Sequence, residues 1–505
     1  MAACLLSSAL KGSNVRIMLV ESSDIATIGV GESTVPSIMD FLRFCRINPR
    51  EFIKASAGSF KLGIRFDNWL KQSHSFFHPF GKVGQKINGY EFYQAWIKTL
   101  QDGHATRWVD HSPSAVMAEN YRFMLDTPQQ KMPLPHYNYA LHIDAILAAR
   151  YLRDFAKTLG VERIEATVNR VVLNEQQFIH GLNLSNGASV ESDFFIDCTG
   201  FKAVLIEGAL KVGYEDWVHY LPCDRAIVAQ TENAGEPHPY TVSTARETGW
   251  TWKIPLQHRT GNGYVFSSQY CSDENAADTL LNVLEGKPLT EPKVIPFITG
   301  RRKKIWYKNC LALGLASGFL EPLESTAIHL VYQTLIHFIN HFPDRDFDSN
   351  VELKFNQHIN ADYQEIRDFI ILHYCTTKRD DTAFWRWCQS MPVPDSLREK
   401  IELFRGRGQL YNNSSHFFGN DSWCSILEGM QVRPEKYHPL MDAFDSSYLA
   451  QALQKNARGI RDIVLKMPMH GDFIKDNCAV KFRGEFIKQS VDYVFIDEQR
   501  KNDRL

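Results

Sequence analysis

Apolar runs in the first part of the chain predict a parallel sheet flanked by helices. The small-residue segment 2–10 predicts a helix, and the apolar run 15–20 that follows it ends at Glu21. Helix, strand and terminal acid form the second half of a dinucleotide-binding βαβ unit. The first strand and the Gly-rich turn of such a unit would lie upstream, and they are absent from this sequence.

The hydrophobic pattern continues with strands at 161–173, on both sides of the turn 185–187, at 194–197 and at 309–315, and with a helix from Asp144 to near Gly160. Residues 239–270 alternate as antiparallel strands do, with 261–263 (Gly-Asn-Gly) predicted as a hairpin turn. A long helix is predicted over 325–342. We therefore expect an α/β fold with a Rossmann-like domain. It would comprise a first part, residues 1–350, that includes an antiparallel substrate sheet, and a mostly helical part, residues 351–505, that binds substrate.

Charge and cysteine content narrow the function classes. The formal net charge of −2 and a pI near 6.8 give no electrostatic reason to expect nucleic acid or an anionic membrane as partner. No apolar run is long enough for a bilayer and the N-terminus lacks the features of a signal peptide, which predicts a cytoplasmic location. The ten cysteines are scattered without a CxxC pair, so reduced thiols are expected.

One histidine pair has metal-ligand spacing. His337 and His341 are four residues apart in a helical stretch, but no HExxH pattern or nearby carboxylate completes a site in the sequence. We therefore predict no metal site.

Glycine-bearing segments at three places favour a flavin. Glu21 stands where such folds place an acid on a ribose hydroxyl, although taken alone it also suits a solvated strand end. Residues 29–36, 197–201 and 314–322 each combine glycine with polar residues at a predicted turn, which lets the backbone approach an extended ligand closely. The predicted FAD contacts are Glu21, Gly31, Glu32, Ser33, Val168, Leu315 and Ile328.

Residues 29–36, 249–255 (GWTWKIP) and 314–328 resemble the marker segments of the flavin-dependent tryptophan halogenase family, and the resemblance covers essentially the whole chain. It implies an FAD-binding domain of the glutathione-reductase or aromatic-hydroxylase type. It also implies a halogenase that uses reduced FAD from a separate flavin reductase, oxygen, and chloride or bromide to make hypohalous acid. The acid would halogenate an electron-rich ring of a small aromatic substrate, such as tryptophan or another indole. The segment 220–225 is similar to the broad-substrate members. Trp250 and Trp252 would separate flavin from substrate, or be ordinary sheet residues.

The resemblance also implies two catalytic residues. Lys61 falls on the position of the family's lysine, which polarises hypohalous acid or becomes a haloamine; alone it would suit a surface lysine. Glu324 falls on the position of an acid that orients the electrophile and takes the ring proton; alone it would suit a helix cap. Backbone N–H groups of Thr326 and Ala327 at a helix N-terminus would bind the halide. The family more often has glycine where Ala327 stands, a departure that bears on halide preference.

His78 and Phe80 match a segment that sandwiches the substrate ring, and Ser325 is placed at the substrate as well. The remaining pocket wall cannot be aligned residue by residue. Candidates from the C-terminal part are Tyr411, Phe417, Phe418 and Trp423.

Two other functions remain open at this point. A flavin-dependent aromatic hydroxylase would share the fold but would not need Lys61. An inactive FAD-binding remnant would account for the absent Gly-rich turn. A homodimer is also compatible with the sequence.

Overall fold

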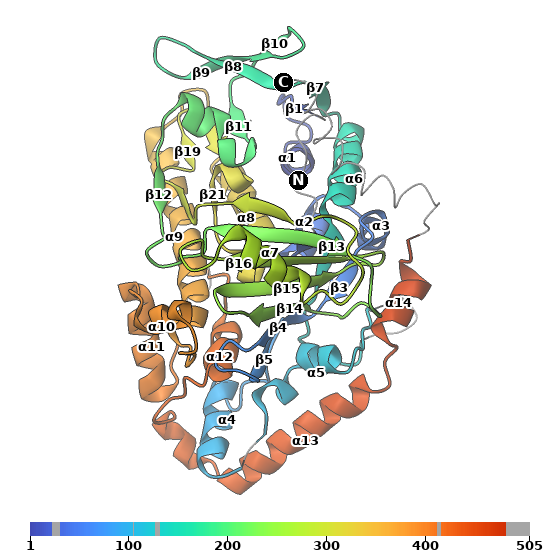
Figure 1. The fold of residues 1–505 in the computed structure, drawn as a ribbon, viewed down its shortest axis with the longest axis vertical. Coiled ribbons are helices and arrows are strands. Elements are labelled where there is room, and N and C mark those ends of the chain that lie inside the picture. Colours follow the sequence, from blue (N-terminus) through green and yellow to red (C-terminus); the bar gives the residue numbers. More distant parts are fainter. Residues whose placement is uncertain (23–30, 105, 127–131, 412–415, 481–505) are drawn as a thin grey trace.

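Parallel strand pairs and helices form the upper part of the molecule in Figure 1. The computed structural model describes residues 1–22, 31–104, 106–126, 132–411 and 416–480. Strand β1 (Met18–Glu21) pairs in parallel with β7 (Glu162–Glu165), and β11 (Phe195–Asp197) pairs in parallel with β20 (Cys310–Ala312). Helix α1 (Ala2–Ala9) packs against α6 (Ala145–Thr158) and α8 (Ala327–Asn340). This mixed α/β arrangement confirms the predicted fold class.

Helix α6 shows how the sequence sets these boundaries. The carboxylate of Asp144 accepts hydrogen bonds from the backbone N–H groups of Ile146 and Leu147, which caps the helix start. The buried guanidinium of Arg259 pairs with the same carboxylate at 2.7 Å and compensates its burial. Helix α6 ends just before Gly160, whose φ of +88° lies in the left-handed region. The prediction of a helix from Asp144 to near Gly160 is confirmed.

Smaller sheets flank these pairs. At the top of Figure 1, β8 (Val168–Leu173), β9 (Ile179–Leu184) and β10 (Ser189–Glu191) form an antiparallel meander whose second turn is the predicted one at 185–187. The other short strands are β12 (Tyr214–Asp216), β18 (Gly300–Arg302), β19 (Trp306–Tyr307) and β21 (Gly318–Phe319).

A seven-stranded sheet crosses the middle of the molecule in the order β17-β13-β16-β15-β14-β4-β5. Its strands are β4 (Gly63–Asp67), β5 (Ser75–Pro79), β13 (Arg225–Thr231), β14 (Thr241–Ala245), β15 (Gly249–Pro255), β16 (Thr260–Phe266) and β17 (Lys293–Pro296). All neighbours are antiparallel except β14 and β4, which are parallel. The predicted antiparallel sheet is therefore present, with one parallel junction.

The predicted hairpin turn at residues 261–263 is wrong, because these residues lie inside β16 and the chain turns instead between β15 and β16 at residues 256–259. Close packing explains the glycines. A Cβ on Gly263 would lie 2.1 Å from the ring of Trp252, and a Cβ on Gly261 would lie 2.9 Å from the backbone nitrogen of Gly31. Glycine here marks close approach and not a turn.

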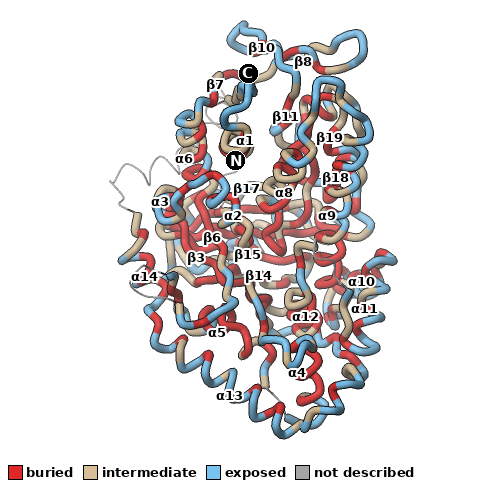
Figure 2. The backbone as a smooth tube through the Cα atoms, turned by 180° about the vertical axis from the view of Figure 1, so that it is seen from behind, coloured by how far each residue is buried: buried red, intermediate tan, exposed pale blue. Residues whose placement is uncertain are grey.

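A three-stranded antiparallel sheet, β2-β6-β3, holds several of the predicted site residues. Strand β6 (Ala140–Asp144) lies between β2 (Gly31–Ser33) and β3 (Ser59–Lys61). The helices around it and around the large sheet are α2 (Ser37–Phe44), α3 (Pro49–Ala55), α4 (Phe92–Gln101), α5 (Pro113–Glu119) and α7 (Asp273–Leu281). Figure 2 shows that the sheets in the middle of the chain trace are mostly buried.

Helices dominate after residue 348, as predicted. They are α9 (Ser349–Cys375), α10 (Ala383–Ser390), α11 (Asp395–Arg407), α12 (Asn420–Gly429), α13 (Ser446–Val464) and α14 (His470–Asn477). Among the residues that the structure describes, no helix is both long and apolar enough to cross a membrane. All ten cysteines are free and most are buried, as predicted.

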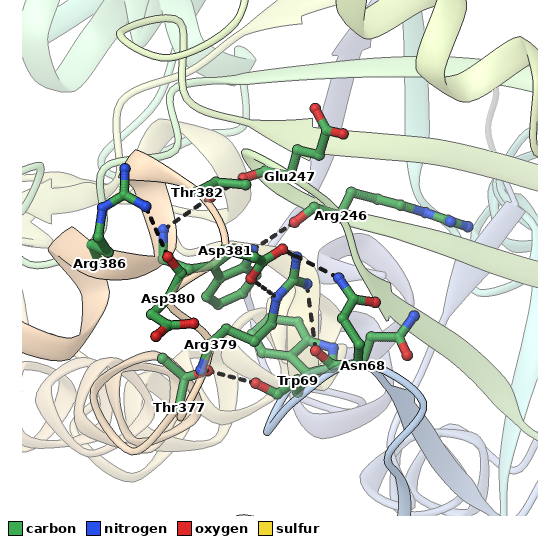
Figure 3. Close-up of polar contacts among 12 residues, drawn as sticks. Asn68, Trp69, Arg246, Glu247, Thr377, Arg379, Asp380, Asp381, Thr382 and Arg386 are labelled. Atoms are coloured by element: carbon green, nitrogen blue, oxygen red, sulfur yellow. Dashed lines mark hydrogen bonds and ion pairs between the residues drawn. The ribbon is translucent and has the colours of Figure 1, made fainter.

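The segment between α9 and α10 fastens these helices to the large sheet, as Figure 3 shows. The guanidinium of Arg379 pairs with Asp381 at 2.7 Å and stacks over the ring of Trp385, 4.6 Å from its centroid. Trp385 Nε1 donates to the carbonyl oxygen of Arg246 at 2.6 Å, and Thr377 Oγ1 donates to that of Trp69 at 2.7 Å. These bonds hold the C-terminal end of α9 in place relative to the sheet.

Candidate active site

Lys61 lies fully buried at the end of β3. Its Nζ donates to the carbonyl oxygen of Thr34 at 3.0 Å and to Oγ of Ser325 at 2.9 Å. It also lies 5.0 Å from the centroid of the Phe80 ring. Burial lowers the pKa of Lys61 to about 7, against the opposing effect of the Glu324 charge. This environment contradicts a snorkelling surface lysine.

Glu324, like Lys61, is a buried charged residue. It ends a short 3-10 turn, Pro322–Glu324, and the next residue, Ser325, has a φ of +61°. A left-handed conformation is uncommon for serine and marks a constrained site. It reverses the chain before α8, so Glu324 does not cap that helix: the N-cap residue is Thr326, without a side-chain cap.

Two imidazoles hold the Glu324 carboxylate. His78 Nδ1, on β5, lies 2.9 Å from Oε2, and His373 Nε2, on α9, lies 3.0 Å from Oε1. Burial would raise the pKa of Glu324, but His78 and His373 outweigh it and lower that pKa to about 2. The carboxylate is therefore ionised at neutral pH. A hydrogen bond from His78 orients Oε2, whereas His373 lies beside Oε1 as a charge contact without hydrogen-bond geometry.

A cavity of about 1930 Å³ is lined by residues of β1 and β11, by the turns that follow β11 and β20, and by the start of α8. All seven residues predicted to contact FAD line it. At its edge, Gly200 and Gly314 have φ of +69° and +64°, so the turns after β11 and β20 require the freedom of glycine. Gly29, at the start of the predicted 29–36 segment, lies outside the described residues. The carboxylate of Glu21 also pairs with Arg163 on the neighbouring strand.

A thin polar wall separates this cavity from Lys61. Ser33, Ser325 and Thr326 line the cavity, and the Ser325 hydroxyl donates to Ser33 Oγ at 3.0 Å. The same Ser325 oxygen accepts from Lys61 on the other side. Lys61, His78, Phe80 and Glu324 do not line the cavity, and they lie behind this wall.

The two tryptophans of β15 line the same cavity and are both buried. Trp250 Nε1 donates to Oε2 of Glu321 at 3.1 Å, and Tyr374 OH donates to the same oxygen at 2.6 Å. Burial raises the pKa of Glu321 to about 7, against the lowering effect of these two hydrogen bonds. Because its indole is fixed by this bond, Trp250 has a defined position at the cavity surface.

Aromatic rings cover the His78 side of the site. Phe369 on α9 stacks on Phe418 with 3.8 Å between ring centroids, and Trp423 contacts Phe369 at 4.9 Å. The His78 ring lies 5.7 Å from Phe369. Tyr411, in contrast, is 69% exposed, so the structure does not bring it into this group.

Sequence reasoning missed three residues of this region, His373, Phe369 and Glu321. His373 and Phe369 are four residues apart on α9 and share a face, a spacing visible in the sequence. Neither residue could be assigned to the site from the sequence, because the C-terminal part contains no motif that aligns with the family. Glu321 falls within the segment 314–322, but nothing local distinguishes it from Glu324.

Comparison with known proteins places the chain in a family. The family model described as tryptophan halogenase matches residues 1–446. The chain is 32% identical over 485 residues to tryptophan 6-halogenase SttH of Streptomyces toxytricini, covering 89% of this chain and 91% of the relative. It is 31% identical over 477 residues to tryptophan 7-halogenase RebH of Lentzea aerocolonigenes, covering 87% and 88%.

A solved structure of a flavin-dependent halogenase also matches this fold. BrvH, a flavin-dependent halogenase from Brevundimonas sp. BAL3, superposes with a TM-score of 0.90 at 41% identity, covering 94% of this chain and 96% of that chain. These matches support halogenation of an aromatic ring and not the hydroxylase alternative. The chain belongs to the tryptophan halogenase family and is a flavin-dependent halogenase.

Proposed function

We propose that this enzyme uses FADH2, O2 and chloride or bromide to make hypohalous acid, and that Lys61 and Glu324 direct this acid onto an electron-rich ring, in particular an indole. The observation that carries the proposal is the placement of a buried lysine and a buried carboxylate directly behind the wall of the large cavity. Overall, FADH2, O2, a halide ion and a proton yield FAD, water and hypohalous acid. The acid and the aromatic ring then yield the halogenated ring and water.

The cavity fits FAD. Its volume of about 1930 Å³ exceeds the roughly 300–1,000 Å³ of ordinary small-ligand sites. The lining combines glycine turns, the strand-end acid Glu21 and two indoles, which suits a long ligand with a ribose and a flat ring system. Bound reduced FAD supplies the electrons that reduce O2. Trp250 and Trp252 would exclude water from the flat ring.

Lys61 is proposed to receive the hypohalous acid. Its two hydrogen bonds, to Thr34 and Ser325, use both N–H groups of a neutral amine and leave the lone pair. A pKa of about 7 means that this neutral form is populated at physiological pH. The nitrogen can then bond to the halogen as the halogen–oxygen bond of the acid breaks, and the departing hydroxide takes one proton from the amine and leaves as water. The same position also allows a protonated Lys61 to donate a hydrogen bond to the acid and polarise it.

Glu324 is proposed to take the proton from the ring carbon that has gained halogen. Its carboxylate is ionised and fixed by His78 and His373, so little reorganisation is needed when the proton arrives. In this ionised state His78 Nδ1 donates its proton to Oε2 and keeps that oxygen in place.

The halide is proposed to bind at the start of α8. The backbone N–H groups of Thr326 and Ala327 belong to the first turn, where no helical carbonyl accepts them, and the helix dipole favours an anion. Both residues line the cavity, so a halide there would lie beside the flavin. The methyl group of Ala327 leaves the backbone donors in place.

The substrate is proposed to lie against His78, Phe80 and the ring cluster of Phe369, Phe418 and Trp423, with Ser325 at its cavity side. Aromatic side chains of this kind bind a flat ring by stacking. We further propose residues 351–505 as the part that supplies most of this wall, a separate flavin reductase as the source of FADH2, and a homodimer in solution. The relatives named as tryptophan halogenases make free tryptophan one candidate substrate.

A substrate screen tests the proposal. The chain is incubated with FAD, a generic flavin reductase, NADH and a panel of indoles, phenols and pyrroles, in chloride and then in bromide. Mass spectrometry should show products that have exchanged one hydrogen for one halogen, with the isotope pattern of that halogen. Products that have gained one oxygen instead would contradict the proposal.

A further inference from the structure

Four side chains with metal-ligand chemistry gather between two neighbouring helices, and none of the four lines the flavin cavity. His337 lies on α8 and His341 directly follows its last residue, whereas His358 and Asp362 lie on α9. Each pair is four residues apart, so both members share one helix face. Because α8 and α9 pack side by side, the two pairs face each other. The carboxylate and the third imidazole that the sequence around His337 lacks therefore come from the next helix.

The distances between these side chains are close to those between ligands of one metal ion. One ring nitrogen from each of the three histidines lies within 4.8 Å of the others, and Nε2 of His337 lies 3.5 Å from Oδ2 of Asp362. Zinc–nitrogen bonds of about 2.0–2.1 Å place tetrahedral ligands roughly 3.3 Å apart. The side chains would therefore need to move by only about 1 Å to meet on one ion.

Two polar atoms of this group are buried without a hydrogen bond. They are Nδ1 of His358 and Oδ2 of Asp362. Buried polar atoms are rarely left without a partner, so each such atom calls for an explanation. The side chains of His337 and Asp362 remain 24% and 22% exposed, which leaves a route for an ion from solvent.

The hydrogen bond of His341 prepares it as a ligand. Its Nδ1 lies 2.8 Å from the carbonyl oxygen of His337, which requires the proton on Nδ1 and leaves Nε2 free to coordinate. Metal-binding histidines are oriented by this kind of second hydrogen bond.

We propose that His337, His341, His358 and Asp362 bind one divalent first-row transition-metal ion, with zinc as the preferred occupant. Three imidazole nitrogens and one carboxylate oxygen suit zinc, whereas calcium and magnesium prefer oxygen ligands alone. The ion would clamp α8 to α9. These helices carry functional groups at other points: α8 begins at Ala327, beside the proposed halide site, and α9 carries His373, which holds Glu324. The role of the ion is to fix the spacing of the two helices.

Metal titration of the full-length, tag-free protein after treatment with a chelator tests the site. Calorimetry with ZnCl2 should give one ion per chain, and zinc should raise the melting temperature. CoCl2 should give the intense visible absorption of tetrahedral Co²⁺, and excess zinc should remove it. Absence of zinc binding, or only the weak absorption of octahedral Co²⁺, would overturn the proposal, and this outcome requires no variant.

Variants locate the ion. His358→Ala and Asp362→Asn should each weaken zinc binding by roughly 10-fold to 100-fold or more. Removing a residue that only hydrogen-bonds to a metal ligand already causes a loss of that size. His180→Ala is the matched control, because His180 is an exposed histidine on β9 with 58% of its side chain accessible. Zinc affinity equal to that of the unmodified chain in both His358→Ala and Asp362→Asn would also overturn the proposal. Loss of zinc affinity in His180→Ala would point to another site.

Discussion

The imidazole of His373 contacts the carboxylate of Glu324, with Nε2 3.0 Å from Oε1. Together with His78 it keeps the pKa of a buried acid low, where burial alone would raise it. His373 is thus a positioning residue that acts through Glu324.

Replacing His373 with phenylalanine should move the acid limb of the halogenation pH profile to higher pH. The pKa of Glu324 is depressed in the folded protein, so its ionised form is lost only as the pH falls towards about 2. Without one imidazole, less of the effect of burial is offset, so the pKa of Glu324 rises and the carboxylate takes up its proton at a higher pH. Rates of product formation between pH 5 and 8 would show this shift as a further loss of rate on the acid side of the change near pH 7 that Lys61 causes, with FADH2 oxidation unchanged. An unaltered acid limb would mean that His373 only fills space.

Glu324→Gln should lower the halogenation rate by roughly 10²-fold to 10⁴-fold, the usual contribution of a general base. The variant keeps the size of the side chain but removes the proton acceptor. Glu321→Gln is the matched control, since its side chain is equally buried and lies three residues away. Comparable rates in the unmodified chain and Glu324→Gln would remove Glu324 from the catalytic residues.

Glu321→Ala should reduce stability. It leaves the buried Tyr374 hydroxyl and the buried Trp250 N–H without their shared acceptor, at a cost of about 1–3 kcal/mol for each group. Glu321→Gln retains an acceptor oxygen and should lose much less. Thermal melting of both variants tests this prediction. Equal melting temperatures for Glu321→Ala and Glu321→Gln would contradict it.

Halogenation should depend on an ionisation near neutral pH. The pKa of Lys61 is lowered from 10.5 to about 7, so its amine loses the proton as the pH rises through that value. If the neutral amine accepts the halogen, the single-turnover rate of halogenation rises through about pH 7 to a plateau. A rate that falls over this interval would instead favour a protonated Lys61 that polarises the acid. FADH2 oxidation, followed separately, corrects for pH effects in the cavity.

Much of the fold follows from local patterns. Alternating apolar residues over 239–270 predicted the part of the large sheet formed by β14, β15 and β16, and the capping acid Asp144 with Gly160 predicted α6, because these signals act within a few residues. The hairpin at 261–263 was wrong because the same glycines serve close packing against Trp252 and Gly31. Local sequence does not distinguish these two uses of glycine.

The site was only partly predictable for a related reason. Lys61 and Glu324 were identified through segments with a recognisable pattern, whereas His373 and Phe369 lie on a helix whose sequence periodicity shows one face but not what it packs against. The group formed by His337, His341 and His358 shows the same limit. Two of the three, His337 and His341, are visible in the sequence as a pair four residues apart, and the third depends on the pairing of two helices.

The most direct test of the central claim uses Lys61→Met, which removes the amine and keeps most of the side-chain volume. Lys61 lies behind the cavity wall, so FAD binding and FADH2 oxidation should proceed as in the unmodified chain. Mass spectrometry of an indole incubated with bromide, FAD and a flavin reductase should show brominated indole with the unmodified chain. With Lys61→Met it should show none above the background from free hypobromous acid. Brominated indole at an undiminished rate in Lys61→Met would contradict the account.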